Sequence, residues 1–151
     1  MTTTQRRHIA LVPHDNKKVE LLEWAAFNAG TLARHHLYAT GTTGTMIEHE
    51  LGLPVTKVLS GPVGGDQQIG AEIAEGLIDL VVFFCDPLEP QPHDPDVKAL
   101  VRVAAVWNIG VACNVTSADL MISSPLLSGL YQRVRPDLGE GEQPQLREQA
   151  G

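Results

Sequence analysis

Residues 80–85 read Leu80-Val81-Val82-Phe83-Phe84-Cys85, an apolar run without polar alternation. Such a run is typical of a strand in a parallel sheet that helices cover on both faces, because neither side of the strand meets water. We therefore place it at or near the centre of a sheet. Four shorter apolar runs give the other predicted strands, at residues 8–12, 36–39, 55–59 and 110–113.

Segments of helical character separate these runs. Apolar residues recur at spacings of three or four in the first segment, at Val19, Leu22, Ala26 and Ala29. The predicted helices cover residues 16–28, 44–51, 65–74, 94–106, 117–122 and 126–134. This alternation predicts a three-layer, doubly wound α/β domain with a five-stranded, mainly parallel sheet and right-handed crossovers.

The chain has 151 residues, which suits one domain with a single core, placed here at residues 1–135. Residues 136–151 are rich in Gly, Glu, Gln and Pro and are predicted to form an acidic, mobile tail.

The net charge of −7 and the lack of a basic stripe argue against nucleic-acid binding. No apolar run approaches the roughly 20 residues that cross a bilayer, and none follows Arg6 and Arg7 as in a secretory signal. A cytoplasmic protein with no membrane partner is expected.

Cys85 and Cys113 each end an apolar run and are interpreted as small buried hydrophobic residues in a reducing compartment. Neither lies in a Cys-x-x-Cys motif or beside a histidine, so a thiolate nucleophile is not expected. A disulfide between them is the less favoured alternative.

Polar or glycine-rich segments follow four of the predicted strands, whereas the opposite strand ends carry none. The carboxyl ends of parallel strands share one edge of the sheet, and ligands bind in the crevice beyond it. The asymmetry therefore predicts a site at that edge. The segments are PHDNKK at residues 13–18, TGTTG at 40–44, SGPVGGDQQ at 60–68 and DPLEPQPHDPD at 86–96.

The segment Thr40-Gly41-Thr42-Thr43-Gly44 places glycines and hydroxyls where a helix is predicted to begin. Free N–H groups, the helix dipole and the threonine hydroxyls all favour a phosphate there. The segment lacks the Gly-Lys-Ser/Thr of a Walker A loop and is not GxGxxG. A tight turn with threonine caps is the alternative interpretation.

Asp66 is predicted to lie in the first turn of a helix, where the dipole favours an ionised carboxylate that can act as a base. A simple helix cap is the alternative.

Two clusters of His and Asp, His14-Asp15 and His93-Asp94-Pro95-Asp96, suit acid–base chemistry. A divalent metal site or ordinary hydrogen bonding are the alternatives. Lys18 lies one helical turn beyond His14 and is either a cation at the same mouth or solvated surface. Together this inventory fits proton abstraction next to a carbonyl on a small phosphorylated substrate.

The segments at residues 13–18, 40–44, 60–68 and 86–96 closely resemble the corresponding motifs of the methylglyoxal synthase family, and the resemblance runs from about Arg7 to Pro125. The resemblance implies conversion of dihydroxyacetone phosphate to methylglyoxal and inorganic phosphate, without a metal or organic cofactor. It also implies a homohexamer that inorganic phosphate inhibits.

The resemblance further assigns roles to particular residues. Asp66 matches the catalytic base, His93 matches the group that polarises the carbonyl and moves protons, and Asp15 and Asp96 match supporting carboxylates. The matched substrate contacts are His14, Lys18, Thr40, Thr42, Thr43, Ser60 and Gly61. An arginine near the family's C-terminus reaches a neighbouring phosphate site. Here it corresponds to Arg147, with Arg133 and Arg135 as alternatives.

Two other functions fit part of the pattern. A regulatory domain of carbamoyl phosphate synthetase shares this fold and binds effectors in an analogous crevice, so a non-catalytic effector-binding module is the main alternative. A metal-dependent phosphatase or lyase that uses the His/Asp pairs is the other. The presence of both Asp66 and the whole 93–96 cluster disfavours the effector-binding module, and activity that survives EDTA would exclude the metal-dependent enzyme.

Overall fold

The computed structural model describes residues 6–58, 65–88, 94–129 and 131–136, with the backbone alone for Asp66 and residues 94–97. Its sheet has five strands in the order β3-β2-β1-β4-β5, and every neighbouring pair is parallel. The predicted fold class is therefore confirmed. The strands are β1 (His8–Pro13), β2 (His36–Thr40), β3 (Val55–Val58), β4 (Leu80–Phe84) and β5 (Gly110–Ala112).

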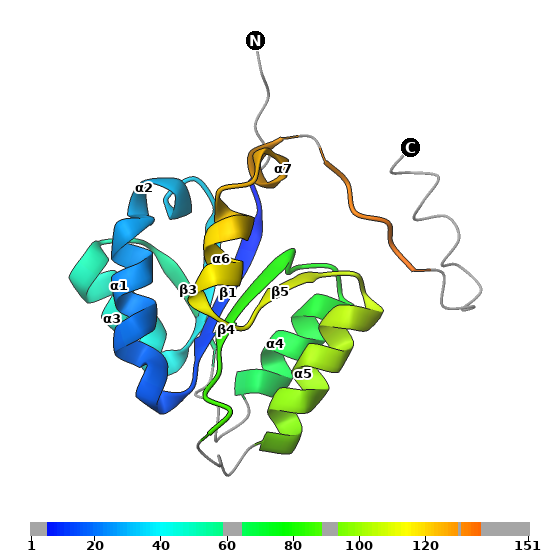
Figure 1. Ribbon diagram of the computed structural model, residues 1–151, viewed down its shortest axis with the longest axis horizontal. Coiled ribbons are helices and arrows are strands. Elements are labelled where there is room, and N and C mark those ends of the chain that lie inside the picture. Colours follow the sequence, from blue (N-terminus) through cyan, green and yellow to red (C-terminus); the bar gives the residue numbers. More distant parts are fainter. Residues whose placement is uncertain (1–5, 59–64, 89–93, 130, 137–151) are drawn as a thin grey trace.

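Helices cover both faces of the sheet (Figure 1). Alternate residues of β1 serve the two faces: Ile9 and Leu11 pack with the cluster under α1, α3 and α6, whereas Ala10 and Val12 pack with the cluster under α4 and α5. All five residues of β4 are buried, as a continuous apolar strand requires. The helices are η1 (Asp15–Lys17), α1 (Lys18–Phe27), α2 (Ala29–Leu32), α3 (Gly41–Leu51), α4 (Gly65–Ala74), α5 (Asp94–Val106), α6 (Val115–Ile122) and α7 (Pro125–Ser128).

One helix buries residues other than those that recur at helical spacing, and one prediction about a helix is wrong. In α1 the buried residues are Leu21, Trp24 and Ala25, while Val19 is 67% exposed, because this helix is apolar on most sides and spacing alone does not single out one face. The last predicted helix ends at Ser128, where Gly129 takes an extended conformation (φ −85°, ψ −167°). Residues 131–136 then continue outside any helix or strand.

The cysteines depart in part from their prediction. Both thiols are free, but Cys85 is only half-buried and Cys113 is exposed. Each lies just beyond the end of its strand. Within the described ranges, no helix is both long and apolar enough to span a membrane.

Candidate active site

The N-termini of several helices converge at the carboxyl edge of the sheet. Because the strands are parallel, the helices that follow them begin there: α1 at Lys18, α3 at Gly41, α4 at Gly65, α5 at Asp94 and α6 at Val115. The first N–H groups of each helix lack partners within the helix, and the dipoles place positive potential at this edge. The edge can therefore attract an anion although the chain carries a net charge of −7.

His14 is a buried candidate side chain at this edge. It follows β1 directly, is 4% exposed, and packs edge-on against the ring of Phe83 with centroids 5.3 Å apart. The backbone N–H of Asp86 donates to its Nδ1 at 2.8 Å. A ring nitrogen that accepts a hydrogen bond carries no proton, so the hydrogen of the neutral imidazole lies on Nε2. His14 is thus held as an N–H donor.

The turn after β4 organises this histidine and is a feature that sequence reasoning missed. The Asp86 carboxylate accepts hydrogen bonds from the Leu88 N–H, at 2.9 Å, and from the Asn16 side chain. These two bonds hold the pKa of Asp86 below its usual value. The turn therefore ties β4 to the loop after β1, with His14 between them. Its one sequence signal is an Asp-Pro pair just beyond a buried strand.

Asp15 and Lys18 lie just after His14, at the same carboxyl edge of the sheet. Asp15 opens η1, Lys18 opens α1, and Lys18 Nζ lies 3.5 Å from Asp15 Oδ1. The Lys18 ammonium thus contacts the segment after β1, and its role at the site stays a prediction. The carboxylate is well exposed and the lysine is less so, which leaves the pair at the solvent boundary.

The threonine segment begins α3 earlier than predicted. The helix starts at Gly41, and Thr40, which is 7% exposed, has the extended backbone of an N-cap without a side-chain capping bond. Thr43 is 1% exposed, and its hydroxyl has no hydrogen-bond partner among the described residues. Thr42 is exposed. A buried hydroxyl beside free helix N–H groups is what a bound phosphate oxygen needs.

Close approach also requires a small residue at Gly44. A Cβ there would lie 2.5 Å from Cγ of Lys57 on the neighbouring strand β3. The lysine stem packs flat against this glycine, and its ammonium pairs with Glu48 at 2.6 Å. Gly44 thus seats the first turn of α3 on the sheet.

For two of the remaining candidates, Asp66 and Asp96, the structure describes the backbone alone. The backbone of Asp66 is the second residue of α4, and that of Asp96 is the third residue of α5, so both carboxylates belong to first turns at the carboxyl edge. Four candidates lie outside the described residues: Ser60, Gly61, His93 and Arg147. Among the side chains that are described, no three His, Cys, Asp or Glu gather closely enough to hold a metal ion.

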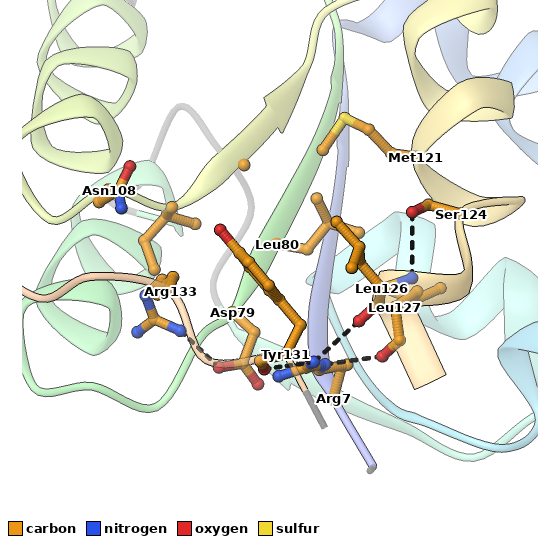
Figure 2. A pocket seen from close by; sticks show the side chains of 12 residues that line it. Arg7, Asp79, Leu80, Asn108, Met121, Ser124, Leu126, Leu127, Tyr131 and Arg133 are labelled. Atoms are coloured by element: carbon orange, nitrogen blue, oxygen red, sulfur yellow. Dashed lines mark hydrogen bonds and ion pairs between the residues drawn. The ribbon is translucent and has the colours of Figure 1, made fainter. Parts of the chain in front are cut away.

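A cavity of about 320 Å³ lies at the opposite, amino edge of the sheet (Figure 2). Leu80 and Gly110, the first residues of β4 and β5, form part of its wall. Arg7 lies at its rim and donates to the carbonyl oxygens of Leu127 at 2.7 Å and Tyr131 at 2.9 Å, which anchors the chain beyond α7. The cavity is therefore separate from the candidate active site.

Arg133 is fixed at this same amino edge. Its Nη1 lies 2.9 Å from Oδ1 of Asp79, whose Oδ2 accepts the N–H of His8. Asn108 adds a hydrogen bond to the carbonyl oxygen of Val134 at 2.9 Å. In this chain Arg133 therefore fastens residues 131–136 to the body and lies at the edge opposite to His14.

Replacing Arg133 by Gln should lower the free energy of unfolding by about 1–2 kcal/mol, since a half-buried charged hydrogen bond is lost. Urea denaturation measures the change. The matched control is Arg102→Gln, which removes the same charge from an exposed position of α5 and should change stability by less than about 0.5 kcal/mol. Equal losses in the two variants would show that the contact with Asp79 contributes nothing specific.

Comparisons with known proteins identify relatives over most of the chain. A family model described as "MGS-like domain" matches residues 20–113. A methylglyoxal synthase of Cellvibrio japonicus (strain Ueda107) is 60% identical over 129 residues, covering 85% of this chain and 84% of the relative. One of Saccharophagus degradans is 59% identical over 132 residues, covering 87% and 86%. The crystal structure of a methylglyoxal synthase from Elizabethkingia anophelis NUHP1 is 51% identical with a TM-score of 0.85, covering 92% of this chain and 91% of that one.

Proposed function

Since the chain belongs to the methylglyoxal synthase family, as its motifs predicted, we propose that it converts dihydroxyacetone phosphate to methylglyoxal and inorganic phosphate. The observation that carries the proposal is the meeting of several helix N-termini, a fixed imidazole donor and a buried threonine hydroxyl at one edge of the sheet. These groups suit the two anionic parts of such a reaction, the phosphate and the developing enediolate.

The phosphate binds at the N-terminus of α3. The N–H groups of its first turn and the Thr43 hydroxyl donate to phosphate oxygens, with Thr40 and Thr42 flanking them. Lys18, held by Asp15, supplies a positive charge at the mouth. Ser60 and Gly61 complete the cradle from the segment before α4.

Asp66 removes a proton from the carbon next to the carbonyl. Its place in the first turn of α4 favours the ionised form that a base requires. An aspartate is a weak base for a carbon acid, so the carbonyl oxygen has to be polarised by donors already in place. His93 is the proposed donor and proton shuttle, His14 a second N–H donor, and Asp96 a carboxylate that orients the histidine.

The orientation of the phosphate decides what becomes of the enediolate. When the C–O bond to phosphate stands perpendicular to the enediolate plane, it overlaps the π system and phosphate leaves by β-elimination. When it lies in the plane, the phosphate stays and the product is an isomer. We propose that the N-terminus of α3 and Gly61 hold the phosphate so that its C–O bond stands perpendicular to the enediolate plane. The enol left behind then tautomerises to methylglyoxal.

The family resemblance extends to assembly and control. We propose a cytoplasmic homohexamer that inorganic phosphate inhibits by occupying the substrate's phosphate site. Residues 1–135 form the catalytic domain and 136–151 an acidic tail, whose Arg147 reaches a neighbouring subunit. One exposed aromatic side chain supports association: Phe27 on α1 is 89% exposed. It borders a hollow of mixed character, lined by Trp24 and Val115 together with Glu20, Glu23 and Asp119. Sedimentation velocity tests the hexamer, and a monomer at micromolar concentration contradicts it.

The activity is tested by measuring both products at once. The purified chain is incubated with dihydroxyacetone phosphate and EDTA, and released phosphate and trapped methylglyoxal are quantified. Equal amounts that grow with enzyme concentration are expected. Phosphate without methylglyoxal would indicate a phosphatase, and loss of activity in EDTA would indicate a metal-dependent enzyme. Neither product, with phosphate still bound, would favour the effector-binding module, which the names of the relatives do not support.

A further inference from the structure

Two free thiols lie side by side at the carboxyl edge of the sheet. Cys85 follows β4 and Cys113 follows β5, and these strands are parallel neighbours, with Val82 opposite Ala112. The Cys85 thiol lies 3.8 Å from the carbonyl oxygen of Cys113 and 3.6 Å from that of Phe83. Side chains alternate along a strand, so Cys113 shares the face of Val111, which packs in the same cluster as Cys85.

The two thiols differ in how easily they react. Burial, together with the neighbouring thiol of Cys113, raises the pKa of Cys85 to about 11. At neutral pH Cys85 is therefore protonated and a poor nucleophile. Cys113 is exposed, so an oxidant in solution reaches it first.

We propose that Cys85 and Cys113 form an intramolecular disulfide when the chain meets a peroxide. The Cys113 sulfur attacks the O–O bond and becomes a sulfenic acid, and the other peroxide oxygen leaves as water or an alcohol. The Cys85 sulfur then displaces hydroxide from that sulfenic acid, and the proton of its thiol completes a molecule of water. Overall the two thiols lose two protons and two electrons, and the peroxide is reduced.

The disulfide would disturb the site described above, a consequence that rests on the proposed function. If the register of Val82 with Ala112 continues, Cys113 lies opposite Phe83, and Cys85 is two residues further along. A disulfide needs Cα atoms about 4.4–6.8 Å apart, so closing it draws the backbone at Cys85 toward β5. The next residue is Asp86, whose N–H holds His14 Nδ1 at 2.8 Å. Oxidation should therefore loosen the imidazole and lower the activity.

The pair is tested first without using activity. The reduced protein is exposed to hydrogen peroxide, remaining thiols are alkylated, and tryptic peptides are analysed by mass spectrometry before and after dithiothreitol. We expect one linked pair of peptides, lighter by two hydrogens than the reduced pair and separated by dithiothreitol, and none in Cys113→Ser. Sulfinic or sulfonic acid at Cys113 with Cys85 still alkylated would overturn the proposal.

The link to the site is tested by activity with dihydroxyacetone phosphate. The wild-type chain should lose activity by about tenfold or more on oxidation and regain it with dithiothreitol, since small displacements of positioning groups have large kinetic effects. Cys113→Ser should start with wild-type activity and keep it in peroxide. Full activity of the disulfide form would refute the link to His14. The mass measurement tests the disulfide even if the reduced chain makes no methylglyoxal. Failure of the disulfide proposal can therefore be distinguished from failure of the proposed enzymatic function.

Discussion

Replacing Asp66 by Asn should lower the turnover of dihydroxyacetone phosphate by about 10²–10⁴-fold, the usual contribution of general base catalysis. Asparagine has nearly the shape of aspartate and can still accept a hydrogen bond, but it cannot take a proton from carbon. Because position 66 is the second residue of α4, the amide remains compatible with the helix start. Thermal unfolding and phosphate binding by calorimetry should therefore stay close to wild type.

A matched control is available on the same helix. Glu72→Gln makes the same acid-to-amide change one to two turns further along α4, where burial raises the pKa of the carboxyl group. An amide removes the cost of burying that charge, so this variant should fold and turn over substrate as the wild type does. If Asp66→Asn keeps more than about a tenth of the rate, or if both variants lose activity alike, another group is the base.

The positions of the strands follow directly from the sequence. Each predicted run contains or overlaps one observed strand. The central strands β1 and β4 are apolar almost throughout because both of their faces are covered, whereas the edge strand β3 exposes Thr56 and Lys57. Parallel topology then fixes which loops meet, so the edge that carries His14 and Thr40 was also predictable. The apolar runs and the polar segments that follow them were sufficient to predict the strands and the site edge, because neither signal depends on contacts between distant residues.

What the sequence did not reveal depends on tertiary contacts. The N-cap at Thr40, rather than a loop up to Gly44, results from the seating of Gly44 against Lys57 of another strand. The hydrogen bond from Asp86 to His14 joins residues 72 positions apart. The Arg133 contact with Asp79 joins residues 54 positions apart and holds a segment that has no periodic pattern of its own. Apart from the Asp-Pro pair at residues 86–87, none of these contacts leaves a local signal, so the sequence supplied candidates without their partners.

A pair of substitutions at His14 should separate its two ring nitrogens. In His14→Asn the side-chain oxygen lies near the position of Nδ1 and can still accept the Asp86 N–H, but no donor reaches the position of Nε2. In His14→Gln the longer amide can donate near Nε2 and leaves the Asp86 N–H without its acceptor. If Nε2–H donates to the substrate, kcat/KM should fall by about 10²–10³-fold in His14→Asn and by less than about tenfold in His14→Gln.

Stability should change in the reverse order. His14→Gln leaves a partly buried N–H unsatisfied and should cost about 1–3 kcal/mol in urea denaturation, whereas His14→Asn should cost less because that bond is kept. The control His49→Asn, at an exposed position in the last turn of α3, should change neither quantity appreciably. If the two His14 variants lose kcat/KM equally, the loss comes from the packing against Phe83 that both substitutions disturb, and the assignment of Nε2 is wrong. A larger loss in His14→Gln would show that the histidine acts by holding the turn at Asp86. Opposite rankings of activity and stability would establish Nε2 as the group that meets the substrate and Nδ1 as the group that positions it.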